Sequence, residues 1–273
     1  MTTHKTKHPR DKFITVYGRK PVLEALSNPD IIIDKLLIAN NASGEFIDEI
    51  VKQAKQRGVK ISRESPKYIT RISRNGRHDQ GVVVDVIPPA MEALSTYLER
   101  QQSHPPNQKP QTRQFLALDG VKNPSNVGMI IRTCLAAGFD GIILPRKGCP
   151  DLNPLVIKAS AGTAFYTRVL RCAELSEALQ QLRQANYTIY GLSGTATSTL
   201  YNLSFSPFSV FVLGNETEGI HSDHHQLIDT WVSIPINSPA ESLNVASAAA
   251  VVCFELKRQH LDQRSSSRNS INL

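Results

Sequence analysis

Three polar, turn-rich segments of this chain each follow a predicted β-strand, and they hold the residues best suited to chemistry. The first, residues 119–132, reads DGVKNPSNVGMIIR. We expect Asn126 to cap the N-terminus of a helix, whose second turn then presents Arg132 beside the polar loop. A guanidinium in that position can hold a phosphate through a forked pair of hydrogen bonds. A solvated surface arginine is the alternative, and this segment alone does not decide between the two.

The second segment, residues 213–219, reads LGNETEG. Gly214 and Gly219 allow the backbone to turn tightly and to approach a ligand closely, and they hold Glu216 between them. A plain strand-to-helix turn has a similar composition, so this segment is also ambiguous by itself.

The third segment, residues 233–252, reads SIPINSPAESLNVASAAAVV, in which a strand ends in a polar loop that enters a helix of mostly small residues. Ser242 or Asn244 can simply cap that helix. Leu243, however, places an apolar contact inside a polar loop, which suits the face of an adenine-like group.

Alternating strands and helices must position these segments. We predict strands at residues 115–119, 141–145, 187–191, 208–213 and 231–236, with amphipathic segments between them. Such alternation favours a mainly parallel sheet covered by helices. Because ligands of open α/β sheets bind beyond the carboxyl ends of the strands, the three segments lie where a site is expected.

Several familiar sites are excluded by their missing motifs. The chain has no G-x-G-x-x-G after its first predicted large-domain strand, no P-loop and no G-x-S-x-G. Its four cysteines form no C-x-x-C pair, which removes zinc ribbons and dithiol redox sites. We predict that His221, His224 and His225 are surface histidines, and we expect no metal site.

A smaller α/β domain precedes the large one. Helices are predicted at 19–26 and 45–57, and strands at 35–39 and 81–87. The predicted organisation is a disordered basic arm at 1–12, a small domain at 13–88, a linker at 89–114, a large domain at 115–260 and a flexible tail at 261–273.

Composition places the chain among folded globular proteins, with 40% hydrophobic and 20% charged residues. The basic excess is N-terminal, since residues 1–90 hold 16 of the 31 Lys and Arg but 10 of the 24 Asp and Glu. This asymmetry indicates either a surface for a polyanion or solubility alone. No apolar run is long enough to cross a bilayer and the N-terminus lacks a signal-peptide pattern, so a cytoplasmic location is expected.

Taken together, N-P-x-N-x-G-x-x-x-R, L-G-N-E-x-x-G and S-I-P-I…E-S-L-N-V-A-x-A-x-A resemble the three signature motifs of the SpoU/TrmH family, in order and spacing. Members of this family, of the SPOUT class, are S-adenosylmethionine-dependent RNA ribose 2′-O-methyltransferases. The resemblance covers 115–258. The segments YGRKPVLEAL and RHDQGVV extend it, because they resemble the substrate-binding domain of the large-subunit ribosomal RNA branch.

The resemblance implies a role for each matching residue. Backbone groups of three residues would contact S-adenosylmethionine: Gly214, Ile234 and Leu243. The catalytic set would be Asn126, Arg132, Glu216, Ser242 and Asn244. In the proposed family mechanism the arginine removes the proton of the ribose 2′-hydroxyl. Because arginine stays protonated in proteins, a bound phosphate would have to assist it, or Arg132 would stabilise developing alkoxide charge instead.

The resemblance also implies a fold and partners. The large domain would carry a deep trefoil knot and would work as a homodimer, with the active site beside the interface. The small domain resembles ribosomal proteins that bind RNA, and five cations would meet phosphates: Lys20, Lys67, Arg71, Arg74 and Arg77.

The leading hypothesis is methylation of a ribosomal RNA guanosine. A transfer-RNA ribose methyltransferase is the nearest rival, and an enzyme that confers resistance to a ribosome-targeting antibiotic would have the same architecture. From another class, a non-catalytic RNA-binding ribosome-assembly factor could share the scaffold. The complete catalytic set disfavours this last alternative.

Overall fold

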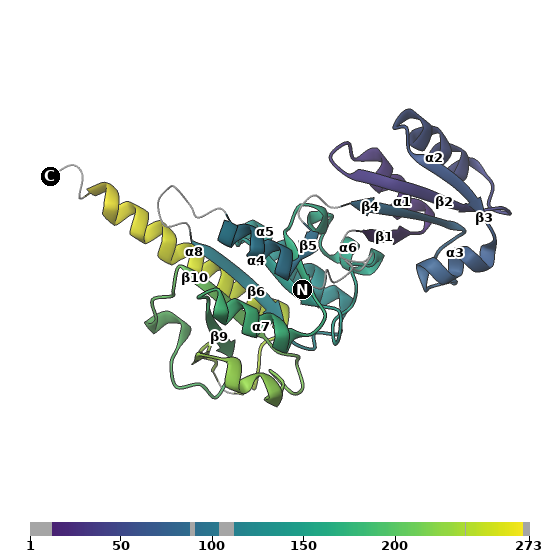
Figure 1. Cartoon of the computed structure of the whole chain (residues 1–273). Coiled ribbons are helices and arrows are strands. Elements are labelled where there is room, and N and C mark those ends of the chain that lie inside the picture. The colour runs from purple at the N-terminus through teal and green to yellow at the C-terminus, as the bar shows by residue number, and fades with distance from the viewer. Residues whose placement is uncertain (1–12, 88–90, 104–111, 238, 270–273) are drawn as a thin grey trace, which may run out of the picture.

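Two sheets, each with its own helices, make up the chain (Figure 1). The computed structural model describes residues 13–87, 91–103, 112–237 and 239–269. The basic arm predicted at 1–12 lies outside the described residues, as do parts of the predicted linker and tail.

The small domain has a four-stranded sheet in the order β1-β4-β2-β3. Its strands are β1 (Ile14–Tyr17), β2 (Ile32–Ala39), β3 (Lys60–Glu64) and β4 (Val82–Ile87). Helices α1 (Arg19–Ser27), α2 (Glu45–Gln56) and α3 (Pro66–Ser73) connect them. β4 pairs antiparallel with both β1 and β2, and its valines are fully buried, so the β-branched run predicted at 81–87 is the centre of this core.

The large domain has a seven-stranded parallel sheet in the order β11-β9-β10-β6-β7-β8-β5. The strands are β5 (Met91–Ala93), β6 (Arg113–Leu118), β7 (Gly141–Pro145), β8 (Val169–Cys172), β9 (Thr188–Leu192), β10 (Phe208–Leu213) and β11 (Thr230–Val232). Its helices are α4 (Leu94–Ser103), α5 (Pro124–Ala137), α6 (Pro154–Ala159), α7 (Leu175–Gln184) and α8 (Val245–Asn269). The predicted mainly parallel α/β sheet is confirmed.

Alternation along the central strands separates two cores. Leu116 and Leu118 of β6 pack in the cluster that includes α5 and α8, whereas Phe115 and Ala117 pack in the cluster that includes α4 and α7. Successive side chains of a strand point to opposite faces, so helices must cover both sides of this sheet. The carboxyl edge is left for loops.

Two predicted boundaries are wrong. The linker predicted at 89–114 contains β5 and α4, which belong to the large domain: β5 pairs with β8, and the buried Tyr97 of α4 meets Phe115 edge to face. The tail predicted as flexible from residue 261 is helical to Asn269. Ion pairs of Arg258 with Glu255 and Asp262, three and four residues away, support that extension.

Candidate functional site

The carboxyl ends of β6 and β10 bring the first two segments side by side. These strands are parallel neighbours with Leu118 opposite Leu213, and the amide of Asp119 donates to the carbonyl of Leu213 at 2.9 Å. The loops that follow the strands therefore start at one place.

One buried amide joins all three segments. Asn126, which is 4% exposed, donates from Nδ2 to Oε1 of Glu216, and its Oδ1 accepts from Nδ2 of Asn244 at 3.2 Å. These partners are 90 and 118 residues away along the chain. Because both the nitrogen and the oxygen of this amide are hydrogen-bonded, the orientation of the Asn126 side chain is fixed.

The expectation that Asn126 caps helix α5 is wrong. Asn123 is the cap, because its Oδ1 accepts from the amide of Ser125 at 2.9 Å and Pro124 follows as the first helical residue. Proline is suited to that position, since its missing N–H would have no helical acceptor there. Asn126 lies one turn further in, which frees its side chain for the site.

The second segment folds back on itself. Asn215 and Gly219 exchange two backbone hydrogen bonds of 3.1 Å, and Oδ1 of Asn215 accepts from the amides of Thr217 and Glu218. A Cβ on Gly214 would lie 2.0 Å from the carbonyl carbon of Gly219, and Gly219 has a φ of 69°. The tight turn predicted from the two glycines is confirmed, and it leaves Glu216 exposed at its tip.

Asp119 is a residue that sequence reasoning missed. Its buried carboxylate accepts from the amide of His221 at 2.7 Å and contacts Nδ1 of His224 at 2.8 Å, so it ties the first loop to the chain after the second. The signal that could have identified Asp119 in the sequence was its position at the carboxyl end of a predicted strand. His224 is therefore not a surface histidine, since its side chain is 14% exposed, whereas His221 and His225 are exposed as predicted. No group of three or more metal-ligating side chains occurs among the described residues.

The third segment is anchored at both ends. Ser233 exchanges backbone hydrogen bonds of 2.8 Å with the 198–200 loop, and Oδ1 of Asn244 accepts from the amide of Ala246 at 2.9 Å. Asn244 thus caps the start of α8 while its other amide atom contacts Asn126. Ile234 packs against the core, whereas Ser242 and Leu243 are exposed.

Arg132 projects from the outer face of α5. It lies off the buried row of Val127, Ile130, Ile131 and Cys134, as predicted, although Leu135 was expected on that row and is 38% exposed. None of the side chains that the structure describes accepts a hydrogen bond from its guanidinium. The structure therefore brings together Asn126, Glu216 and Asn244. Arg132, on the same helix as Asn126, and Ser242, two residues before Asn244, are both exposed.

The predicted RNA-binding cations are all exposed, but they do not form one group. Lys67 and Arg71 lie on α3, with the guanidinium of Arg71 4.8 Å from the ring centre of Tyr68. Arg74 follows in a left-handed conformation, and Arg77 lies in the next turn. Lys20 lies on another element, in the first turn of α1.

A buried carboxylate holds the turn that carries Arg77. Asp79 accepts from Oγ of Ser73 at 3.0 Å, from Oγ1 of Thr70 at 3.2 Å and from the amide of Gly81 at 2.9 Å. This anchor explains how a polar loop keeps one shape beside α1.

Comparisons with known proteins place both halves of the chain. A family model described as SpoU rRNA Methylase family matches residues 113–254, and one described as RNA 2′-O ribose methyltransferase substrate binding matches residues 15–91. The chain is 32% identical over 246 residues to an uncharacterized tRNA/rRNA methyltransferase of Mycolicibacterium vanbaalenii, covering 89% of this chain and 76% of the relative.

Two further similarities bear on activity. The 23S rRNA (guanosine-2′-O-)-methyltransferase RlmB of Xanthomonas campestris is 29% identical over 249 residues, covering 90% of this chain and 96% of that protein. The crystal structure of an AdoMet-bound rRNA methyltransferase from Sinorhizobium meliloti superimposes with a TM-score of 0.62 at 25% identity, covering 92% of this chain and 88% of that one.

Proposed function

The chain belongs to the SpoU rRNA methylase family, and from that premise we propose that it transfers a methyl group from S-adenosylmethionine to a ribose 2′-hydroxyl of RNA, at a guanosine of large-subunit ribosomal RNA. The observation that carries the proposal is the convergence of Asn126, Glu216 and Asn244 through two hydrogen bonds at the carboxyl edge of the sheet. The relative named as a 23S rRNA guanosine methyltransferase supports the choice of RNA.

The residues at this edge fit the proposed cofactor. Ile236 and Leu243 expose 36% and 38% of their surface within polar loops, which suits the apolar faces of an adenosyl group. Nothing stands within 4 Å of where a Cβ on Gly219 would be, so the loop backbone is open to a ligand. We assign Gly214, Ile234 and Leu243 to cofactor binding. S-adenosylmethionine, when bound, supplies an electrophilic methyl group.

The chain's own residues would then position the ribose. The Asn126 amide holds Glu216 and Asn244 in one arrangement, which limits the conformations that the reacting groups must search. Arg132 faces solvent, where an RNA phosphate can reach it; there it either assists removal of the 2′-hydroxyl proton together with that phosphate or stabilises the alkoxide. Ser242 lies on the same loop as Asn244 and would orient the ribose or Arg132.

We also propose a homodimer. Met129 and Leu135 of α5 are 42% and 38% exposed, and Phe254 of α8, the helix packed against α5, is 49% exposed. Exposed apolar side chains on adjoining helices suit a protein interface. Arg132 lies midway between Met129 and Leu135 on the same helical row, so a dimer through this face would place it beside the interface.

The remaining expectations are the trefoil knot, which the resemblance implies, and a cytoplasmic location, which ribosomal RNA as substrate supports. No helix in the described part of the chain is both long and apolar enough to span a membrane.

Transfer of labelled methyl from S-adenosylmethionine to unmodified ribosomal RNA and transfer RNA, followed by mapping of the product, tests the proposal. We expect a ribose 2′-O-methyl in ribosomal RNA. Label in transfer RNA alone would show that transfer RNA, and not ribosomal RNA, is the substrate. No transfer and no cofactor binding would favour a non-catalytic assembly factor.

A further inference from the structure

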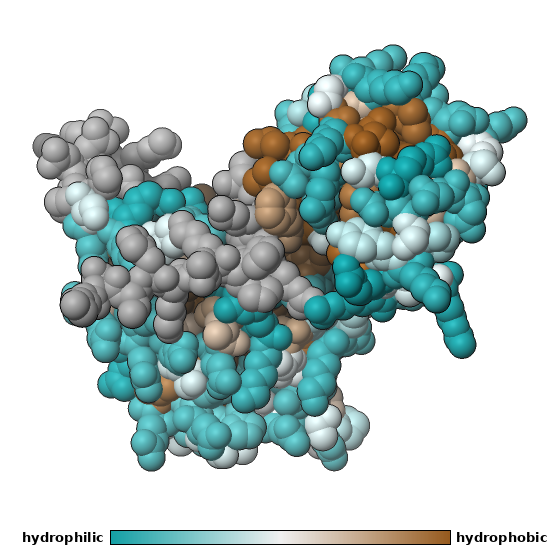
Figure 2. All heavy atoms as spheres, turned by 45° about the vertical axis from the view of Figure 1, so that its right-hand side comes forward, coloured by the Kyte–Doolittle hydropathy of each residue, from teal (hydrophilic) through white to brown (hydrophobic). Residues whose placement is uncertain are grey.

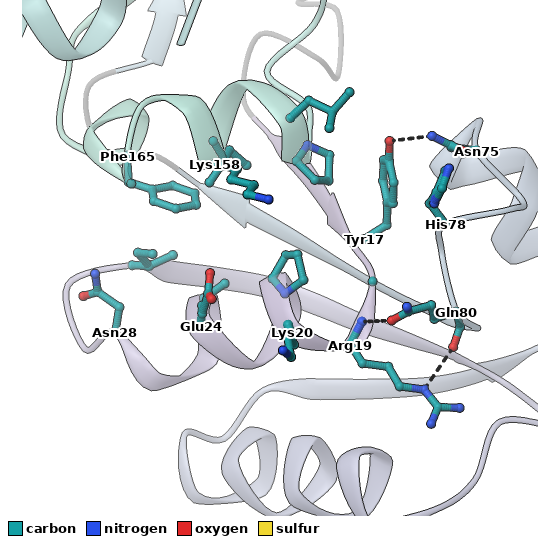
Figure 3. Close-up of a pocket in the computed structure, with 18 of the residues that line it drawn as sticks. Tyr17, Arg19, Lys20, Glu24, Asn28, Asn75, His78, Gln80, Lys158 and Phe165 are labelled. Carbon is teal, nitrogen blue, oxygen red and sulfur yellow. Dashed lines mark hydrogen bonds between the residues drawn. The ribbon is translucent and has the colours of Figure 1, made fainter. Parts of the chain in front are cut away.

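A cavity of about 1410 Å³ lies between the small and large domains, and none of the residues assigned above to methyl transfer or cofactor binding lines it. Its small-domain wall is the start of α1 with the loop at 75–81, and its large-domain wall is α6 with the turn at 161–166 (Figure 3). Figure 2 shows the hollow between the two domains, with apolar side chains along its small-domain side. Pockets for small molecules occupy roughly 300–1,000 Å³, so this volume favours an extended ligand.

Both walls supply positive charge. Arg19 and Lys20 of α1 line the small-domain side, where Nε of Arg19 donates to the carbonyl of Gln80 at 3.5 Å, and Lys158 of α6 points into the space between the two helices (Figure 3). Among the described residues that line the cavity, Glu24 alone carries a carboxylate. Cations on both walls with a single carboxylate between them favour a polyanionic ligand.

The cavity also presents aromatic faces. Tyr166 and Phe46 line it and are 46% and 45% exposed. Oη of Tyr166 accepts a hydrogen bond from Nδ2 of Asn28 at 2.7 Å, which joins the two domains across one end of the cavity and orients the ring. Exposed aromatic rings beside cations are the combination on which unpaired bases stack while their phosphates are neutralised.

The large-domain wall lies directly against the helix of the proposed site. A Cβ on Gly128 of α5 would be 2.5 Å from the Cβ of Ala159 at the end of α6, so the two helices pack backbone to backbone. Helix α5 also carries Asn126 and Arg132. A ligand in the cavity is therefore one helix away from the residues assigned to methyl transfer.

We propose that this interdomain cavity holds a single-stranded segment of the RNA substrate, with phosphates paired to Arg19, Lys20 and Lys158 and a base stacked on Tyr166. The inference rests on the proposed function, because it names how the substrate reaches that site. It adds Lys158 and Tyr166 of the large domain to the RNA-binding surface, whereas the cations of α3 lie outside the cavity.

Fluorescence anisotropy of the full-length protein with a labelled single-stranded oligouridylate tests the proposal across a salt series. Each phosphate contact to a single strand contributes about 0.7 to the slope of log affinity against log salt, so Lys158→Ala should make that slope shallower by about 0.7. Tyr166→Ala should weaken binding about tenfold without changing the slope, because stacking contributes roughly 1–3 kcal/mol per base. Tyr166→Phe keeps the ring and should retain most of the affinity.

Lys55→Ala is the matched control, since Lys55 is an exposed lysine of α2 outside the cavity, and it should bind as wild type does. If the Lys158→Ala and Tyr166→Ala proteins bind with wild-type affinity and slope, the cavity assignment is overturned. A duplex of the same length tests the single-strand assignment. If it binds as tightly as the single strand, and Lys158→Ala weakens binding whereas Tyr166→Ala does not, the single-strand assignment is overturned. Methyl transfer by wild type is measured separately: its absence, with normal oligouridylate binding, would overturn the proposed function and leave the cavity assignment standing.

Discussion

Replacing Gly214 with alanine is the sharpest perturbation of the proposed site. The added methyl would stand 2.0 Å from the carbonyl carbon of Gly219 and 2.3 Å from both its oxygen and the amide nitrogen of Ile220. All three atoms belong to the backbone and cannot rotate away. Ordinary contact begins near 3.4 Å, so the turn must open by more than an ångström.

Opening the turn removes the two backbone hydrogen bonds between Asn215 and Gly219. At about 0.5–1.5 kcal/mol each, their loss destabilises the fold by about 1–3 kcal/mol. For a chain of roughly this size each kcal/mol lowers the melting temperature by about 2–4 °C, so differential scanning calorimetry should show a decrease of several degrees. Isothermal titration should show loss of S-adenosylmethionine binding, because Gly214 is assigned to the cofactor.

Gly194→Ala is the control for this substitution. Gly194 lies in another loop at the carboxyl edge, its φ is outside the left-handed region, and nothing stands within 4 Å of the added methyl. It should melt and bind cofactor as wild type does. A Gly214→Ala protein that melts with wild type and binds S-adenosylmethionine equally well would refute the reasoning.

Three further predictions concern other residues. Asn244→Ala should lower turnover on RNA more than cofactor affinity, because it removes the amide that donates to Asn126. Steady-state kinetics that show only a raised KM for S-adenosylmethionine would contradict this. Arg258 lowers the pKa of Glu255, so the stabilisation is present at neutral pH and is lost as the pH falls through this lowered pKa; urea unfolding should show Glu255→Gln less stable than wild type at neutral pH, and the difference should shrink progressively as the pH falls below the ordinary pKa of a glutamate. Partial burial raises the pKa of Cys149 to about 11 and of Cys172 to about 12, so both thiols should react slowly with iodoacetamide until the protein is denatured, and fast labelling of the native protein would contradict these raised pKa values.

The sequence predicted the frame of the site well. Runs such as FSVFVL at 208–213 are apolar on both faces, as the buried strands of a parallel sheet must be, and polar loops follow them. Because parallel strands end at one edge, the meeting of Asn126 and Glu216 followed from the pattern in outline. Their hydrogen bond did not, since it depends on how α5 begins after Pro124.

Other features depend on tertiary context alone. β5 is three residues long, follows two prolines in sequence, and is a strand only because the edge of β8 pairs with it. Asn123 and Asn126 are equally good caps by residue type, and the proline between them decided which was used. The cavity between Lys20 and Lys158 joins residues of two domains, so no local pattern announces it.

A comparison of Arg132→Ala with wild type tests the central claim most directly, by measuring S-adenosylmethionine affinity and single-turnover methyl transfer to ribosomal RNA on the same preparations. Because Arg132 is exposed on the outer face of α5, we predict that fold and cofactor affinity are unchanged while transfer to the ribose 2′-hydroxyl is lost. Transfer by the variant at the wild-type rate would contradict the assignment of this arginine and of the site built around it.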